Sequence, residues 1–347
     1  MNAILGDSVA SPAVWAITIV VTVGVLLVDL LVIARRPHEP TMGEVSRHPA
    51  LFVGMAIVFG VALLVFAHPH ELSPNPGAEF FAGWLTEYSL SVDNLFIFII
   101  IMNSFAVPRQ FQQTALMIGI VLALIMRAIF IIVGAAAVNE FSWVFYLFGL
   151  FLVYTAVKLA KEGGEDEDEY EENRPVKFAE NHLPATKEWN GTKLFSPENG
   201  KRVITPMFPV VLTLGTTDLL FALDSIPAIY GLTQDPYLVF TANIFALMGL
   251  RQLYFLIGGL LQRLIYLSYG LAFLLAFIGV KLILHAMHEN ELPFINGGHG
   301  IHWAPEIPIW LSLVVIIGTP AVTAVASPGG LRSDDRGRAG RRNGSSP

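Results

Sequence analysis

Cysteine is absent from this sequence of 347 residues. Disulfide bonds, thiol redox chemistry and thiolate metal sites are therefore excluded for the chain's own side chains. Charged residues are scarce as well, at 14% of the chain, while 54% of the residues are hydrophobic. Such a composition is too apolar for a water-soluble globule, so it predicts an integral membrane protein.

Three further patterns are missing. No basic stretch is interleaved with aromatic residues, so we expect no nucleic-acid partner. No nucleophile, base and orienting residue can be recognised together, so we expect no enzymatic activity. The N-terminus also lacks the basic start of a cleaved secretory signal, because Asp7 precedes the first long apolar run. That run predicts a true membrane span.

Long apolar runs dominate what is present. A helix needs about 20 apolar residues to cross a bilayer, and about nine stretches approach this length. They cover approximately residues 14–34, 51–67, 80–105, 113–138, 141–160, 206–231, 236–260, 264–285 and 307–326.

Positive charge is distributed unevenly between the connections. Lys and Arg follow the first, third, fifth, seventh and ninth spans, whereas the connections 67–79, 139–140, 233–235 and 289–306 contain none. Because connections rich in Lys and Arg stay in the cytoplasm, we expect a multi-pass protein with these connections on the cytoplasmic side. Its N-terminus would lie outside and its C-terminus in the cytoplasm.

The acidic positions of the third span recur in the sixth. Each half then continues with an arginine seven residues before a glycine and with a Val-Lys-Leu triplet. The matched residues are Glu87, Asp93, Asn94, Arg127 and Lys158 in the first half, and Asp218, Asp224, Ser225, Arg251 and Lys281 in the second. The third and sixth spans run in opposite directions in the predicted topology, so the two repeats are inverted, as in many transporters.

We therefore predict an all-α fold: a polytopic transmembrane helical bundle with an inverted repeat of three plus three helices and about nine spans. Six segments are expected. They are two N-terminal spans (1–77), a first three-helix repeat (78–160), an acidic cytoplasmic loop (161–204), a second three-helix repeat (205–288), an outer loop with the last span (289–326) and a disordered basic cytoplasmic tail (327–347).

Four acids within two spans need compensation, because an ionised group at the centre of a span costs about 2.5–3.5 kcal/mol. Glu87 and Asp93 differ by about 9 Å in height and about 120° in direction on one helix. We expect two tiers, with Glu87 level with Asp224 and Asp93 level with Asp218. The predicted metal ligands are Glu87, Asp93, Asn94, Asp218, Asp224 and Ser225. This is a hard oxygen set of the kind that Mg²⁺, Ca²⁺ and Mn²⁺ prefer.

The alternative is that the acids simply pair with Arg127 and Arg251. Two arginines cannot neutralise four acids, so we assign them charge compensation and still expect a bound cation or protons. Lys158 and Lys281 lie near opposite ends of their spans and are expected to extend to the lipid headgroups.

The two acidic motifs resemble the paired signatures of the TerC/Alx family, and are most similar to its Alx-like branch. They read Glu87-Tyr-Ser-Leu-Ser-Val-Asp93-Asn94 and Asp218-Leu-Leu-Phe-Ala-Leu-Asp224-Ser225-Ile-Pro227-Ala. The resemblance implies a protein of the bacterial cytoplasmic membrane that acts in manganese homeostasis, generally efflux. Older names in the family refer to tellurium resistance and a redox role. One position departs: Gly215 stands where many relatives carry an acid, so the inner tier would hold less charge.

From these features we expect a transporter that exports Mn²⁺ in exchange for protons through paired intramembrane carboxylates, with no permanently bound cofactor. Its partners would be a divalent cation, protons and the lipid bilayer, while a homo-oligomer or a membrane-protein partner is left open. The alternative is a non-transporting membrane factor that acts with protein-insertion or stress-response complexes of the tellurium-resistance type. A cavity that reaches the acids favours transport, and an acid cluster sealed by arginine favours the factor.

Overall fold

The computed structural model describes residues 8–35, 42–69, 73–162, 189, 191–198, 201–257, 267–290, 292–301, 303–323 and 326. Two predicted site residues, Asp93 and Arg251, belong to helices of this part, but their side chains lie outside the description. The basic tail predicted for 327–347 and most of the acidic loop predicted for 161–204 also lie outside the described residues.

The described chain is built from apolar helices, which confirms the predicted all-α membrane bundle. The main helices are α2 (Pro12–Arg35), α3 (Met42–Phe66), α4 (Pro76–Ser104), α5 (Arg109–Glu140), α6 (Val144–Glu162), α8 (Met207–Tyr230), α9 (Pro236–Ile257), α10 (Leu267–His288) and a last helix at Ile309–Thr323. Each predicted span coincides with one of them. A short 3₁₀ turn, η2 (Asn296–Gly298), lies in the connection before the last helix.

Four of the described helices are long and apolar enough to cross a membrane, and four shorter apolar helices accompany them. The four long ones are Arg109–Val138, Val144–Lys161, Met207–Tyr230 and Ser268–His288. The number of nine spans therefore stays a prediction.

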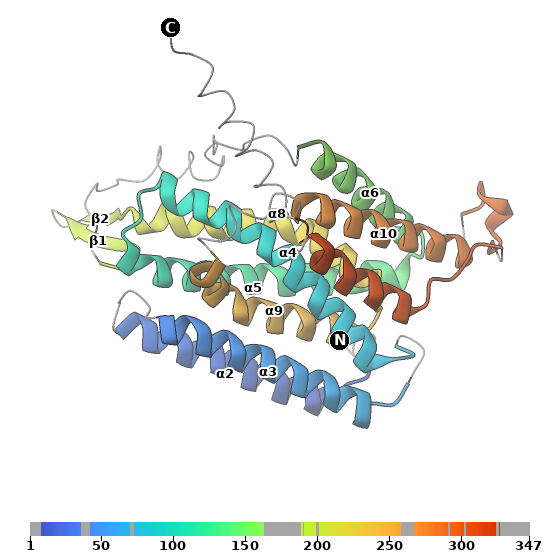
Figure 1. Cartoon of the computed structure of the whole chain (residues 1–347), viewed down its shortest axis with the longest axis horizontal. Helices are drawn as coiled ribbons and strands as arrows, with labels where there is room; N and C mark the ends of the chain where they lie inside the picture. Colours follow the sequence, from blue (N-terminus) through green and yellow to red (C-terminus); the bar gives the residue numbers. More distant parts are fainter. Residues whose placement is uncertain are drawn as a thin grey trace, which may run out of the picture.

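The helix pairing has a two-fold pattern. Helix α4 packs mainly against α9, α5 packs against α8, and α6 packs against α10. The pairing is unchanged when α4, α5 and α6 are exchanged with α8, α9 and α10, as the predicted repeat requires. The repeat itself stays a prediction. Figure 1 shows α2 and α3 lying along one side of this six-helix core, and α3 packs on α9 and α4.

A hairpin marks one end of the bundle. Strands β1 (Phe195–Glu198) and β2 (Lys201–Ile204) pair antiparallel, with Phe195 opposite Ile204. Phe195 packs against Phe208 of α8 with the two rings tilted, and Ile204 is buried. The predicted loop 161–204 therefore ends in a folded hairpin whose apolar residues pack against the helix bundle. We call this the hairpin end; the opposite end, where residues 231–235 connect α8 to α9, is called the Asp235 end (Figure 1).

Helices α6 and α10 approach each other closely at two glycines. A Cβ added to Gly279 would lie 2.9 Å from the carbonyl oxygen of Gly149, and one added to Gly149 would lie 2.8 Å from the carbonyl oxygen of Gly279. Small residues allow the backbones of membrane helices to approach each other this closely. Inside a bilayer, van der Waals packing rather than the hydrophobic effect drives helix association.

Replacing Gly279 with valine should therefore push α6 and α10 apart and destabilise the protein. We expect a loss of about 1–3 kcal/mol, the usual range for overpacking, measured as a lower melting temperature of the detergent-solubilised protein. Gly54→Val is the matched control, because no atom lies within 4 Å of a Cβ at Gly54. Equal melting temperatures for both variants would contradict the close crossing.

Candidate functional site

Arg127, in the middle of α5, is fully buried and joins four helices. Its Nε donates a hydrogen bond to Asp218 Oδ2 at 2.8 Å, and its Nη2 donates to Asp218 Oδ1 at 3.2 Å. Its Nη1 donates to Glu87 of α4, to Asn243 Oδ1 of α9 at 2.9 Å and to Ser225 Oγ of α8 at 3.1 Å. The paired bonds to Asp218 use the planar fork of the guanidinium, which suits a carboxylate. We call these five residues the Arg127 cluster.

The Arg127 cluster has more negative than positive formal charge. When both acids are ionised, Glu87 and Asp218 carry two negative charges and Arg127 carries one positive charge. Glu87 Oε2 is buried and has no hydrogen-bond partner among the described residues, and the same holds for Ser91 Oγ one turn further along α4. A buried carboxylate oxygen without a partner is costly, so it favours a proton or a cation beside it.

Helix periodicity explains which predicted ligands come together. Ser225 follows Asp218 by seven residues, or about two turns, so both side chains lie on one face of α8. Asn94 follows Glu87 by the same interval on α4, and it is also buried. Both motifs therefore direct one acid and one neutral side chain, rather than two acids, to the same face.

Asp224 lies apart from the Arg127 cluster. It is six residues from Asp218, which turns it about 120° away, and it accepts a hydrogen bond from Thr155 Oγ1 of α6 at 3.0 Å. The predicted tier of Glu87 with Asp224 is therefore wrong for this conformation, because Glu87 shares Arg127 with Asp218 instead. Asp93 and Arg251 were predicted as a ligand and a charge-compensating residue, and these roles stay predictions.

Asn243 was missed by sequence reasoning. It is 1% exposed, and its amide is oriented by a hydrogen bond from its Nδ2 to the Val239 carbonyl at 3.0 Å. Its Oδ1 is thereby directed to Arg127. A buried amide in an otherwise apolar span was the available signal, because polar side chains in membrane helices usually serve an interhelical bond. It carries no charge, so it was not singled out.

The cluster is closed in this conformation. Glu87 and Arg127 are 0% exposed, and Asp218 and Ser225 are 1% exposed. Within the described ranges, no three His, Asp or Glu side chains already surround one point as metal ligands. Arg127 lies between the two acids and occupies the place that a cation between them would take.

Gly215 adds no ligand to this site. A Cβ there would approach Leu122 Cδ2 of α5 to 2.4 Å, so apolar packing fills the place where relatives are expected to carry an acid. Lys281 also differs from expectation: its ammonium donates to the buried Ser312 Oγ at 3.3 Å. It therefore ties α10 to the last helix instead of extending to the headgroups.

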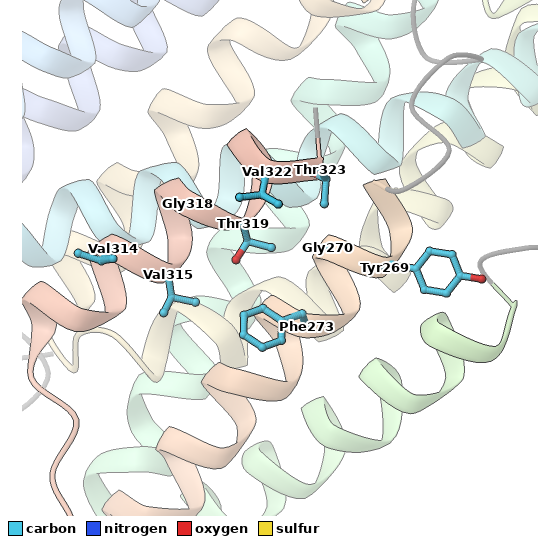
Figure 2. Close-up of a pocket in the computed structure, with 9 residues that line it drawn as sticks. All are labelled: Tyr269, Gly270, Phe273, Val314, Val315, Gly318, Thr319, Val322 and Thr323. Atoms are coloured by element: carbon cyan, nitrogen blue, oxygen red, sulfur yellow. The ribbon is translucent and has the colours of Figure 1, made fainter. Parts of the chain in front are cut away.

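A separate groove of about 460 Å³ lies between α10 and the last helix. Figure 2 shows that residues from both helices line it, and that none of them is charged. They are Tyr269, Gly270, Phe273, Val314, Val315, Gly318, Thr319, Val322 and Thr323. The lining contains hydroxyl groups but no charged side chain to balance a divalent cation, so the groove is not a candidate for the metal site.

Comparison with known proteins gives a consistent family. Residues 72–329 match the model described as "Integral membrane protein TerC family". The chain is 48% identical over 321 residues to an uncharacterised membrane protein of Mycobacterium tuberculosis, covering 92% of this chain and 79% of the relative. It is 38% identical over 320 residues to an uncharacterised membrane protein of Myxococcus xanthus, covering 92% and 93%.

A third relative has a functional name. The chain is 33% identical over 323 residues to the "Putative membrane-bound redox modulator Alx" of Escherichia coli K12, covering 92% of this chain and 95% of the relative. No solved structure matches. The Arg127 cluster lies wholly inside the matched region, whereas α2 and α3 precede it.

Proposed function

Because this chain belongs to the TerC family of integral membrane proteins, we propose that it exports divalent cations, with Mn²⁺ as the expected substrate, in exchange for protons. The observation that carries this proposal is the buried Oε2 of Glu87, which has no hydrogen-bond partner in the described part of the chain, although Arg127 joins Glu87 to Asp218. Buried acids in a membrane protein are costly, and they usually belong to an ion or proton pathway.

Arg127 is proposed to act as a built-in counter-ion. A divalent cation brings two positive charges, which Glu87 and Asp218 together balance. Arg127 must then withdraw from at least one acid, or a further acid such as Asp93 must join the site. In the absence of a cation, Arg127 returns between the acids and keeps the empty transporter closed.

Exchange with protons follows from the ligand chemistry. A carboxylate has to lose its proton before it can hold a cation, so Mn²⁺ affinity should rise with pH and binding should release protons. The decisive experiment is flux in proteoliposomes, with Mn²⁺, Mg²⁺ and Ca²⁺ compared side by side and internal pH recorded. We expect Mn²⁺ flux with opposing proton movement; Mn²⁺ flux without a pH change would contradict proton exchange.

The orientation of the protein can be tested independently. The loop 161–204 and the C-terminal tail are proposed to face the cytoplasm. Both contain Lys and Arg residues, which the positive-inside rule assigns to that side of the membrane. The single substitutions Ser196→Cys and Ser345→Cys in this cysteine-free chain should give thiols that react with an impermeant reagent in inverted vesicles but not in intact cells. Labelling of either variant in intact cells would reverse the assigned orientation.

The second candidate function is a non-transporting membrane factor. The complete burial of the Arg127 cluster favours it, since a sealed cluster of acids and arginine can be purely structural. The flux experiment separates the two candidates: folded protein that moves none of the three cations supports the factor. The E. coli relative carries the name of a redox modulator, but thiol redox chemistry is not open to a chain without cysteine.

A further inference from the structure

We infer that residues 8–10 form a strap that closes the Asp235 end of the bundle, and that α9 couples the strap to the Arg127 cluster. This inference rests on the proposed transport function, because it assigns the gate of the same site. Since the cluster is fully buried, some part of the molecule has to move before an ion can reach it.

The strap is held by one buried carboxylate. Ser8 Oγ donates to Asp235 Oδ1 at 3.0 Å, and the Val9 backbone N–H donates to Asp235 Oδ2 at 2.6 Å. Asp235 is 0% exposed, and the next strap residue, Ala10, is 3% exposed. The start of the described chain is therefore folded into the end of the bundle.

The same carboxylate caps α9. Asp235 Oδ1 also accepts hydrogen bonds from the backbone N–H groups of Tyr237 at 2.8 Å and Leu238 at 3.4 Å. These are the first-turn donors that a helix leaves unsatisfied. Strap and helix start thus share one acceptor, so release of the strap changes the surroundings of the first turn of α9.

A second buried carboxylate connects this end to α4. Glu79 Oε2 accepts a hydrogen bond from Thr233 Oγ1 at 2.7 Å, and Glu79 Oε1 accepts one from the Asn75 backbone N–H at 2.9 Å. Helix α4 carries Glu87, and the connection 231–235 leads into α9. The connection 231–235 is therefore bonded both to the strap and to the first turn of α4, and these are the ends of the two helices that supply Asn243 and Glu87 to the cluster.

Helix α9 links the two sites mechanically. Asn243 follows Asp235 by eight residues, a rise of about 12 Å on a helix, and its Oδ1 accepts the bond from Arg127 at 2.9 Å. A shift of the Asp235 end of α9 would move this acceptor relative to Arg127. Among the described residues, the strap is attached by the hydrogen bonds to Asp235 and by the small buried side chain of Ala10. The helices share much longer apolar interfaces, so the strap is the easier part to release.

The test compares thiol labelling in strap variants. The reporter is Ser91→Cys, which lies one turn from Glu87 in a chain with no other cysteine. An impermeant maleimide is applied to intact cells and to inverted vesicles, so the orientation need not be assumed. Ser8→Ala combined with Val9→Pro removes both strap donors but leaves the α9 cap intact. Ser11→Ala is the matched control, since it removes only a local bond to the Val14 N–H.

We expect the strap variant to raise the labelling rate of the Ser91→Cys reporter about tenfold from the side on which Ser8 lies, because charge-assisted bonds hold that end closed. The other side and the Ser11→Ala control should show no change. Ser8→Asp, which places a second negative charge beside Asp235, should have the same effect without altering the backbone. Unchanged labelling in both folded strap variants overturns the inference.

Flux measured on the same proteins separates this inference from the proposed function. Accelerated labelling in a protein that moves no Mn²⁺ supports the strap and rejects transport. Mn²⁺ flux together with unchanged labelling supports transport and rejects the strap. Mn²⁺ flux that loses its proton coupling when the strap is released supports both.

Discussion

Replacing Arg127 with methionine should strongly destabilise the protein, because it leaves Glu87 and Asp218 buried without their shared cation. Removing one partner of a buried ion pair costs about 3–5 kcal/mol. For a protein of this size, such a loss lowers the melting temperature by roughly 10 °C. Thermal unfolding of the detergent-solubilised protein measures the change. Arg109→Met is the control, since Arg109 is exposed at the start of α5.

The cause of that loss can be isolated by a compensating variant. Arg127→Met combined with Glu87→Gln and Asp218→Asn removes all three charges and keeps the approximate side-chain volumes. If unpaired charge is the problem, this triple variant should recover most of the lost melting temperature, because replacing a whole buried ion cluster is often neutral. A triple variant as unstable as Arg127→Met alone would show that packing, rather than charge, holds the site.

Glu87→Gln should have the opposite profile: flux is lost while stability is kept. The substitution removes the excess negative charge and leaves Arg127 paired with Asp218 through two hydrogen bonds. The folded protein should therefore melt at the same or a higher temperature. Loss of an outer-shell partner typically costs about 10–100-fold in metal affinity, so loss of a direct ligand should reduce Mn²⁺ flux by at least about 100-fold.

Proteoliposome flux and melting temperature should be measured on the same preparation of the Glu87→Gln variant. Glu140→Gln, at the exposed end of α5, is the control that removes a glutamate without touching the cluster. Normal Mn²⁺ flux through Glu87→Gln would remove this carboxylate from the transport site. A large fall in melting temperature would mean instead that Glu87 is needed for structure.

The sequence by itself determined the membrane class, the helical fold and the positions of the costly residues. These follow from local quantities: an apolar run long enough for a bilayer predicts a helix, and an ionisable residue within it is exceptional wherever the helix packs. Glu87, Asp218 and Arg127 were recognised in this way, and Ser225 as the neutral oxygen ligand next to Asp224. The pairing of Arg127 with the acids was also foreseen, as an alternative to a metal site.

Only the tertiary structure decided which of these residues meet. The rotation of one helix against another depends on packing, so the spacing within α8 could not show that Asp218 faces Arg127 while Asp224 faces Thr155 of α6. Asn243 carries no charge and acquires its role only through the position of α9 beside α5. The bond between residues 8–9 and Asp235 joins positions more than two hundred residues apart. No periodicity in the chain can encode such a contact, because it depends on where the completed helix bundle places its ends.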